Sequence, residues 1–316
     1  MEKRALGRSG LEVGALALGT MNFGSDWLGS GLVDERAGRE LLAAARDRGV
    51  NLLDTADIYG YGASEELLGR LLKGQRSKWL VATKVRAPMV EGDPASGGLS
   101  AKRIGEGLDA SLKRLRTDHV DLYMPHWPDE GVPLEESLEA FAHAQKKGKV
   151  RVLGCSNFPP GLWKAALEWA GRTGPRLEFG EVQLSLAAPA AAREFAPLCE
   201  AAGTSLLAWS PLGGGFLTGK YRAAARPAGR RRDPAKAYPP LPERRLEGVL
   251  TLLEKVAALE GVTMAQAALG WTLAQPGVAC AVVGARDLRQ LEETLDARPL
   301  SPKTRSLLDR AAALVA

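Results

Sequence analysis

Short apolar runs alternate with amphipathic segments along most of this chain. Eight runs rich in Val, Leu or Ile predict strands, at residues 15–21, 51–56, 79–85, 120–126, 151–157, 181–185, 205–211 and 279–285. Segments with apolar residues on one helical face lie between or beside them, at residues 34–48, 100–116, 133–147, 160–171, 189–202, 245–259, 263–275 and 287–295. Short strands that alternate with helices are typical of a parallel sheet. Eight such units predict an α/β fold, a parallel (β/α)8 TIM barrel.

Two segments fall outside these eight units. Residues 3–15 predict an N-terminal β-hairpin, turning at Arg8-Ser9-Gly10, that covers the bottom of the barrel. Residues 222–244 are rich in Pro and Arg and predict a long βα loop after the seventh strand. Because no linker or repeat divides the chain, we expect a single domain over residues 1–316.

Composition excludes several functional classes. The net charge of +5 is modest and mostly dispersed, so we expect no nucleic-acid partner. No run approaches the roughly 18 apolar residues of a membrane span, and the start MEKRALGRSG lacks a signal-peptide core. Cys155, Cys199 and Cys280 lie far apart without metal-ligand spacing. We therefore expect a cytoplasmic protein without a metal, acting on a small molecule.

Polar residues lie near the ends of three neighbouring predicted strands. Asp54, Lys84 and His126 come late in the second, third and fourth strands, and Tyr59 follows Asp54. These ends meet at one face of a barrel. Each residue alone has a structural explanation, such as a loop cap, a packed ring or a solvated charge. Together, an Asp–Lys pair beside a tyrosine would lower the cost of phenolate and make the hydroxyl a usable proton donor. Ser64-Glu65-Glu66 predicts only the ordinary start of a helix after this loop.

Five spaced motifs resemble those of the aldo-keto reductase family. The family signature resembles DTADIYGYGASEELLG, and its strand-four histidine motif resembles MPHWPD. Its later segments are similar to GKVRVLGCSNF, AWSPLGGGFLTGKY and VVGARDLRQLEETL, in the same order. The resemblance runs from about Arg4 to about Ala297 and implies an eight-stranded α/β barrel, in agreement with the strand count. It also implies the NADP(H)-dependent reduction of an aldehyde or ketone.

The resemblance implies a catalytic role for four residues. Tyr59 would protonate the carbonyl oxygen, and Lys84, held by Asp54, would lower the pKa of Tyr59. His126 would orient the substrate carbonyl. Tyr61 is the rival for the acid role, and the spacing after Asp-Thr-Ala favours Tyr59.

The resemblance also implies an NADP (NADPH) cofactor across the barrel mouth. No GxGxxG follows the first strand, so a Rossmann site is not supported. A helix start with Arg286 after the eighth strand suits a 2′-phosphate and favours NADP over NAD. The expected cofactor-binding residues are Gly19, Thr20, Met21, Asp54, Ser156, Asn157, Gln183, Trp209, Ser210, Pro211, Leu212, Gly215, Leu217, Lys220, Gly284, Ala285, Arg286, Gln290, Glu293 and Thr294. The expected substrate-binding residues are Trp27, Tyr59, Met89, His126 and Trp127.

Departures and alternatives remain. Leu184-Ser185 follows Gln183 where the family usually has a Tyr-Asn pair, and Thr294 stands where Asn is common.

One alternative function is a sugar or alcohol dehydrogenase that runs in the oxidative direction with the same residues. Another is a mainly NADP-binding regulatory subunit of a membrane assembly, against which the intact catalytic set argues. We expect a monomer.

Overall fold

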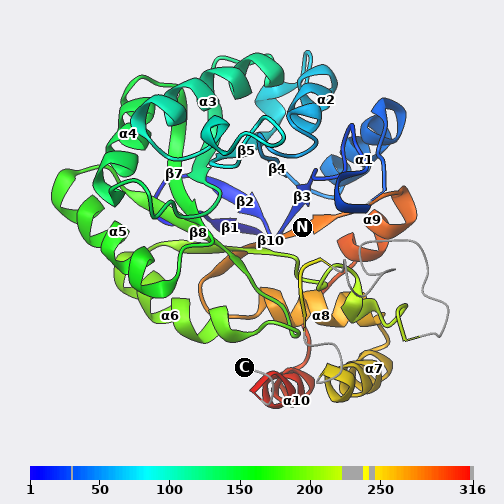
Figure 1. Ribbon diagram of the computed structural model, residues 1–316. Helices are drawn as coiled ribbons and strands as arrows, with labels where there is room; N and C mark the ends of the chain where they lie inside the picture. Colours follow the sequence, from blue (N-terminus) through cyan, green and yellow to red (C-terminus); the bar gives the residue numbers. More distant parts are fainter. Residues whose placement is uncertain (30, 223–237, 242–245, 314–316) are drawn as a thin grey trace.

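The structure is a computed structural model that describes residues 1–29, 31–222, 238–241 and 246–313. Within these residues, eight parallel strands form a closed barrel in the order β10-β3-β4-β5-β6-β7-β8-β9. Figure 1 shows the helices arranged around the outside of the barrel. The predicted parallel (β/α)8 TIM barrel is therefore confirmed. The strands are β3 (Leu16–Gly19), β4 (Leu52–Asp54), β5 (Leu80–Val85), β6 (Val120–Pro125), β7 (Val150–Ser156), β8 (Leu177–Gln183), β9 (Ser205–Trp209) and β10 (Val278–Gly284).

Helices connect successive strands. Several begin at side-chain caps: Asp34 caps α1, Ser100 caps α3, and Thr263 forms a capping box with Gln266 on α8. The helices are α1 (Glu35–Asp47), α2 (Ala63–Leu71), α3 (Ala101–Leu115), α4 (Leu134–Lys146), α5 (Pro160–Thr173), α6 (Ala190–Ala202), α7 (Glu247–Glu260), α8 (Met264–Leu273), α9 (Leu288–Leu295) and α10 (Pro302–Ala313). No helix in the described part of the chain has the length and apolar character of a membrane span.

The N-terminal hairpin closes the end of the barrel at which the strands begin. Its strands, β1 (Lys3–Ala5) and β2 (Glu12–Gly14), pair antiparallel. Leu6 and Val13 are buried against side chains of the barrel interior. Arg4 donates hydrogen bonds to two carbonyl groups, that of Leu273 at the end of α8 and that of Val278 at the start of β10. The predicted hairpin is thus present and leaves the opposite end of the barrel to the βα loops.

Two elements differ from the sequence-based expectation. β8 begins at Leu177, earlier than the expected start at residue 181, because Glu178 and Gly180 interrupt the apolar pattern there. The sequence pattern also missed α10, which packs beside α7. The long loop expected at residues 222–244 lies largely outside the described residues, which include only residues 222 and 238–241 of it.

A stability measurement tests the closing role of the hairpin. We expect Leu6→Ala to lower the free energy of unfolding by about 2–5 kcal/mol, because Leu6 is fully buried and its truncation leaves a cavity. Urea unfolding followed by circular dichroism measures this change. Leu11→Ala, in the same hairpin but only partly buried, should cost clearly less. A loss below about 1 kcal/mol for Leu6→Ala would contradict the role.

Candidate active site

The carboxyl ends of β4, β5 and β6 bring four polar side chains together. Asp54 is the last residue of β4, Lys84 lies one residue before the end of β5, and His126 directly follows β6. Tyr59 lies in the loop between β4 and α2. The ring of Tyr59 has its centre 5.4 Å from Lys84 Nζ and 5.7 Å from the centre of the His126 imidazole. The four expected catalytic residues therefore form one cluster.

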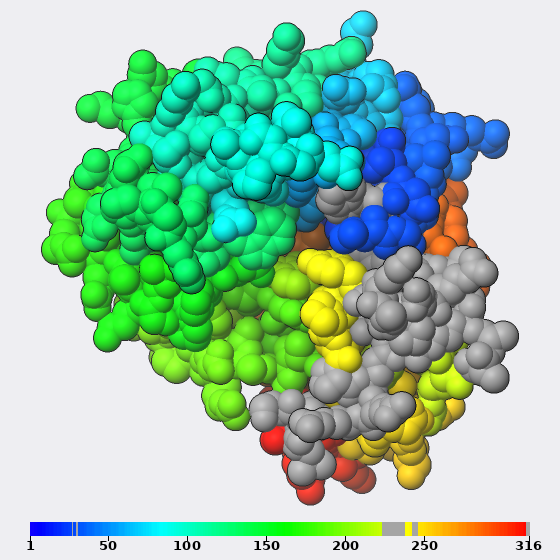
Figure 2. Space-filling view, in the orientation of Figure 1, coloured from blue at the N-terminus to red at the C-terminus, as the bar shows by residue number. Residues whose placement is uncertain are grey.

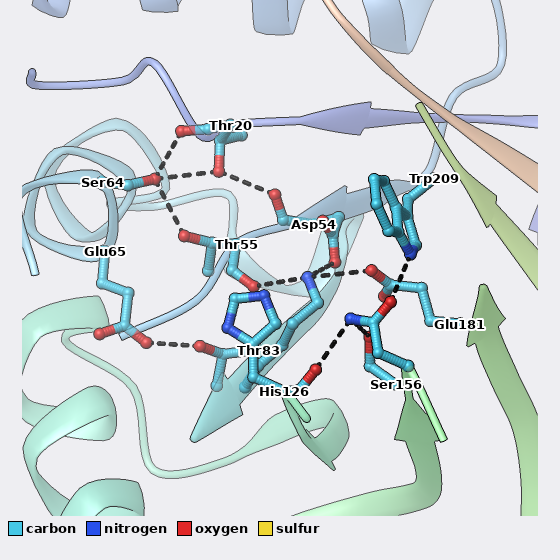
Figure 3. A network of polar contacts seen from close by, with 12 residues as sticks. Thr20, Asp54, Thr55, Ser64, Glu65, Thr83, His126, Ser156, Glu181 and Trp209 are labelled. Carbon is cyan, nitrogen blue, oxygen red and sulfur yellow. Dashed lines mark hydrogen bonds and ion pairs between the residues drawn. The ribbon is translucent and has the colours of Figure 1, made fainter. Parts of the chain in front are cut away.

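The ammonium group of Lys84 is fully buried among oxygen atoms. It donates to Asp54 Oδ1 at 2.5 Å and to the Thr55 carbonyl at 3.1 Å, and it lies 3.4 Å from Glu181 Oε1. Figure 3 shows Asp54 and Glu181 reaching this point from different strands. Burial alone would lower the pKa of Lys84, but the carboxyl groups of Asp54 and Glu181 raise it above its ordinary value. Lys84 is therefore a cation at neutral pH.

Glu181, in β8, is a site residue that the sequence analysis missed. Its side chain is buried and lines the same cavity as Tyr59. Burial and then the neighbouring Asp54 raise the pKa of Glu181 to about 8, although Lys84 opposes this rise. The sequence did contain a signal for Glu181, which is the carboxylate at the start of the apolar run 181–185. A buried strand rarely carries a charge without a partner.

Burial and three charged neighbours together determine the acidity of Tyr59. Burial raises the pKa of Tyr59, Lys84 lowers it, and Asp54 and Glu181 raise it again, which leaves it well above the ordinary value. The lowering by Lys84 is thus present but smaller than the effect of burial. Tyr59 keeps its proton at neutral pH, as a proton donor must.

His126 is a buried, neutral imidazole. Burial lowers its pKa well below the ordinary value, and the nearby cations Lys84 and Arg86 lower it further. The ring stacks on Trp127 with centres 3.8 Å apart and planes 17° apart, and it meets the Tyr59 ring edge-on at 75°. These contacts fix the orientation of the imidazole at the mouth.

A hydrogen-bonded corner at the end of β7 connects His126 with Trp209. Asn157 has a φ of 58°, a left-handed conformation that asparagine adopts more readily than most residues. Its amide nitrogen donates to the His126 carbonyl at 2.9 Å and to Ser156 Oγ at 3.0 Å, and its oxygen accepts from Trp209 Nε1 at 2.9 Å. Figure 3 shows His126, Ser156 and Trp209 around this corner. Trp209 also stacks on Tyr238, with ring centres 6.3 Å apart.

The start of α2 has no side-chain cap, and Ser64 and Glu65 in its first turn contact the strand ends instead. Ser64 and Glu65 are both fully buried. Ser64 Oγ lies 3.0 Å from Thr20 Oγ1 and 2.9 Å from Thr55 Oγ1, within hydrogen-bonding distance of both hydroxyls. Glu65 accepts from Thr83 Oγ1 at 2.6 Å. Figure 3 shows these contacts, which connect α2 to residues at the ends of β3, β4 and β5.

A cavity of about 580 Å³ extends from this cluster to the start of α9. The hollow near the centre of the face in Figure 2 lies beside the yellow segment 238–241. Of the residues expected to bind a cofactor, those that line the cavity are Gly19, Thr20, Met21, Asp54, Asn157, Trp209, Ser210, Pro211, Leu212, Gly215, Lys220, Gly284, Ala285, Arg286, Gln290, Glu293 and Thr294. Ser156, Gln183 and Leu217 do not line it within the described structure. Arg289 and Tyr238 do line it, and the sequence analysis missed both.

The expected substrate-binding residues lie in different surroundings. Tyr59, His126 and Trp127 line the cavity. Met89 packs instead in a small apolar cluster beside Ile58. The side chain of Trp27 lies outside the described structure.

Among the described residues, three cationic side chains line the far end of the cavity: Lys220, Arg286 and Arg289. Partial burial and then Arg286 lower the pKa of Lys220, although Asp287 and Glu293 oppose this. Asp287 caps α9 by accepting from the Gln290 amide. This end of the cavity therefore combines positive charge with a helix N-terminus, a combination that favours a bound anion.

Known proteins share both sequence and fold with this chain. The sequence model described as "Aldo/keto reductase family" matches residues 15–313. Uncharacterized oxidoreductase YrpG of Bacillus subtilis is 38% identical over 317 residues, which cover 95% of this chain and 92% of YrpG. A probable voltage-gated potassium channel subunit beta of Arabidopsis thaliana is 34% identical over 96% of this chain and 92% of its own length. The holo form of aldo-keto reductase AKR11C1 from Bacillus halodurans has a TM-score of 0.81 and 28% identity, over 98% of this chain and 96% of that one.

Proposed function

Because the chain belongs to the aldo/keto reductase family of oxidoreductases, we propose that it uses NADPH to reduce an aldehyde or ketone to an alcohol. The observation that carries this proposal is the Lys84 cation, buried beside a protonated Tyr59 and a neutral His126 at the mouth of the cavity. An acid, a cation that favours its conjugate base and a neutral orienting group are what carbonyl reduction requires.

The cavity suits a nicotinamide dinucleotide. Its volume of about 580 Å³ is within the usual range for ligand sites. Gly213, Gly214 and Gly215 all have positive φ angles, which glycine adopts without strain, and this turn edges the cavity. Lys220, Arg286 and Arg289 would hold the phosphates, and Trp209 and Asn157 would contact the nicotinamide. When bound, the reduced nicotinamide would supply a hydride to the carbonyl carbon.

The proton would come from Tyr59. The neutral imidazole of His126 would hydrogen-bond the substrate carbonyl and orient its oxygen toward the Tyr59 hydroxyl. Tyr59 would then donate its proton to that oxygen, and the nearby Lys84 ammonium would stabilise the phenolate that remains. Asp54 would hold Lys84 in place through their 2.5 Å contact. Trp127, which also lines the cavity, would give the substrate an apolar wall.

The oxidative alternative would use the same residues in reverse, because the group that donates a proton in reduction accepts it in oxidation. We propose the reductive direction because the raised pKa of Tyr59 keeps the phenol protonated, as proton donation to a carbonyl needs. The free, buried cysteines fit a reducing, cytoplasmic setting, and we retain a monomer as the expected state.

A second candidate is a nicotinamide-binding subunit of a membrane protein assembly. The similarity to the Arabidopsis potassium channel subunit beta favours it. Such a protein would bind NADPH but would not oxidise it when a carbonyl compound is added. Turnover with a panel of aldehydes, ketones and sugars therefore separates the two candidates.

Replacement of Tyr59 tests the acid role. We expect Tyr59→Phe to lower kcat for aldehyde reduction by about 10²–10⁴-fold, because the phenyl ring has no proton to donate. The decrease in NADPH absorbance measures the rate, and cofactor fluorescence measures NADPH binding, which should stay close to that of the wild type.

Tyr61→Phe is the matched control, because Tyr61 is a tyrosine of the same loop that does not line the cavity in the described structure. It should keep most of the wild-type rate. If the two variants behave in the opposite way, Tyr61 is the acid. If both keep ordinary turnover, the mechanism is wrong.

Replacement of Arg286 tests the choice of NADPH over NADH. We expect Arg286→Ala to raise the Kd for NADPH by about 10–100-fold, since a hydrogen bond to a charged group contributes about 1.5–3 kcal/mol. The Kd for NADH should change little, because NADH lacks the 2′-phosphate. Fluorescence titration with each cofactor measures both constants.

Arg305→Ala removes the same charge from an exposed position on α10 and should leave both Kd values unchanged. Equal weakening of NADPH and NADH binding by Arg286→Ala would rule out the 2′-phosphate contact.

A further inference from the structure

Lys84 has two carboxyl neighbours, although one would suffice to hold it. Asp54 reaches it from β4, and Glu181 reaches it from β8 on another side of the barrel. Both carboxyl groups are buried, and burial raises the pKa of each. Lys84 opposes this rise, but its ammonium lies 2.5 Å from Asp54 and 3.4 Å from Glu181, so it favours the ionised form of Asp54 more strongly. Of the two, Glu181 is therefore the group that holds a proton.

The balance of charge explains why one proton is held there. One buried cation between two ionised carboxylates would leave a net negative charge in a setting shielded from water, which is costly. Asp54 on β4, Lys84 on β5 and Tyr59 face Glu181, as does the buried thiol of Cys280 on β10. Among these groups, Lys84 is the cation. Protonation of Glu181 makes the cluster neutral.

We propose that Glu181 is a positioning residue that sets the acidity of Tyr59 by holding or releasing one proton beside Lys84. This proposal rests on the proposed function, because it gives Tyr59 the role of acid. With Glu181 protonated, the charges of Lys84 and Asp54 balance each other. The ammonium of Lys84 then favours the phenolate that Tyr59 becomes after it donates its proton. With Glu181 ionised, a second negative charge opposes that phenolate and makes Tyr59 a weaker acid.

The consequence is a fall in activity at mildly alkaline pH. Burial and Asp54 raise the pKa of Glu181 to about 8, so Glu181 keeps its proton below about pH 8 and loses it above. Reduction should therefore slow above pH 8, although Tyr59 itself still carries its proton there. Glu181→Gln mimics the protonated form at every pH and should remove this fall.

Glu178 on the same strand supplies a matched control. It is also buried, but it lies at the other end of β8, where it accepts from the Arg8 amide at 2.7 Å and pairs with Arg176. Glu178→Gln therefore removes a buried β8 carboxylate without changing the charge near Lys84. A purely structural role for Glu181 would give both variants the same pH profile as the wild type.

Two measurements test the proposal. The first follows the carboxyl carbon of Glu181 by ¹³C NMR in protein labelled at glutamate, with its resonance assigned by its loss in Glu181→Gln. The second follows kcat/KM for aldehyde reduction between pH 6 and pH 9.5 in the wild type, Glu181→Gln, Glu178→Gln and Glu181→Asp. We expect the chemical shift of the Glu181 carboxyl carbon to titrate with an inflection near pH 8. We also expect an activity loss of about tenfold by pH 9.5 that is absent only in Glu181→Gln.

The outcomes separate this proposal from the proposed function. A Glu181 resonance that titrates below pH 6, or a wild-type alkaline fall that persists in Glu181→Gln, would overturn the role of Glu181. Glu181→Asp keeps an ionisable group and should retain the fall, so it serves as the second variant if Glu181→Gln folds poorly. The NMR titration needs no turnover. Failure of the proposed function appears instead as no NADPH oxidation by the wild type with any carbonyl compound, and failure of the acid role as ordinary turnover by Tyr59→Phe.

Discussion

The buried ammonium of Lys84 is the group on which the rest of the barrel mouth depends. Its burial is tolerated because oxygen atoms from β4, β8 and the main chain of Thr55 surround it. In return, the cation determines which groups keep their protons nearby. It favours the ionised form of Asp54, helps to keep His126 neutral and partly offsets the effect of burial on Tyr59. One charge thus organises residues that lie far apart in the sequence.

The barrel supplies the rigidity that this arrangement needs. Parallel strands place Asp54, Lys84 and His126 at adjoining strand ends, and the hydroxyls of Thr20, Thr55 and Ser64 join the loops behind them. The hairpin closes the other end of the barrel. The same mouth continues into a cavity with cations at its far end, so the proposed acid and the cations proposed to bind phosphate lie along one continuous cavity.

Local patterns predicted much of this arrangement. Apolar runs located the strands, and Asp54 and Lys84 stood out because charges are unusual at the ends of such runs. Glu181 was missed because its importance comes from Lys84, which lies on a strand almost 100 residues earlier in the chain. The start of β8 was missed for a different reason, because Glu178 and Gly180 interrupt its apolar pattern. The net pKa of Tyr59 was also beyond sequence reasoning, because it depends on burial and on a third charged neighbour.

The central claim is that the Lys84 cation sustains proton delivery by Tyr59. The most direct test is the single-turnover rate of NADPH oxidation by Lys84→Met with an excess of aldehyde. The rate is measured at pH 6, where Glu181 is protonated, because this reduces the free-energy cost of burying the two carboxyl groups without the Lys84 cation. The account predicts NADPH binding close to that of the wild type and a turnover rate lower by at least about 10²-fold. A rate within a few-fold of the wild type would contradict it.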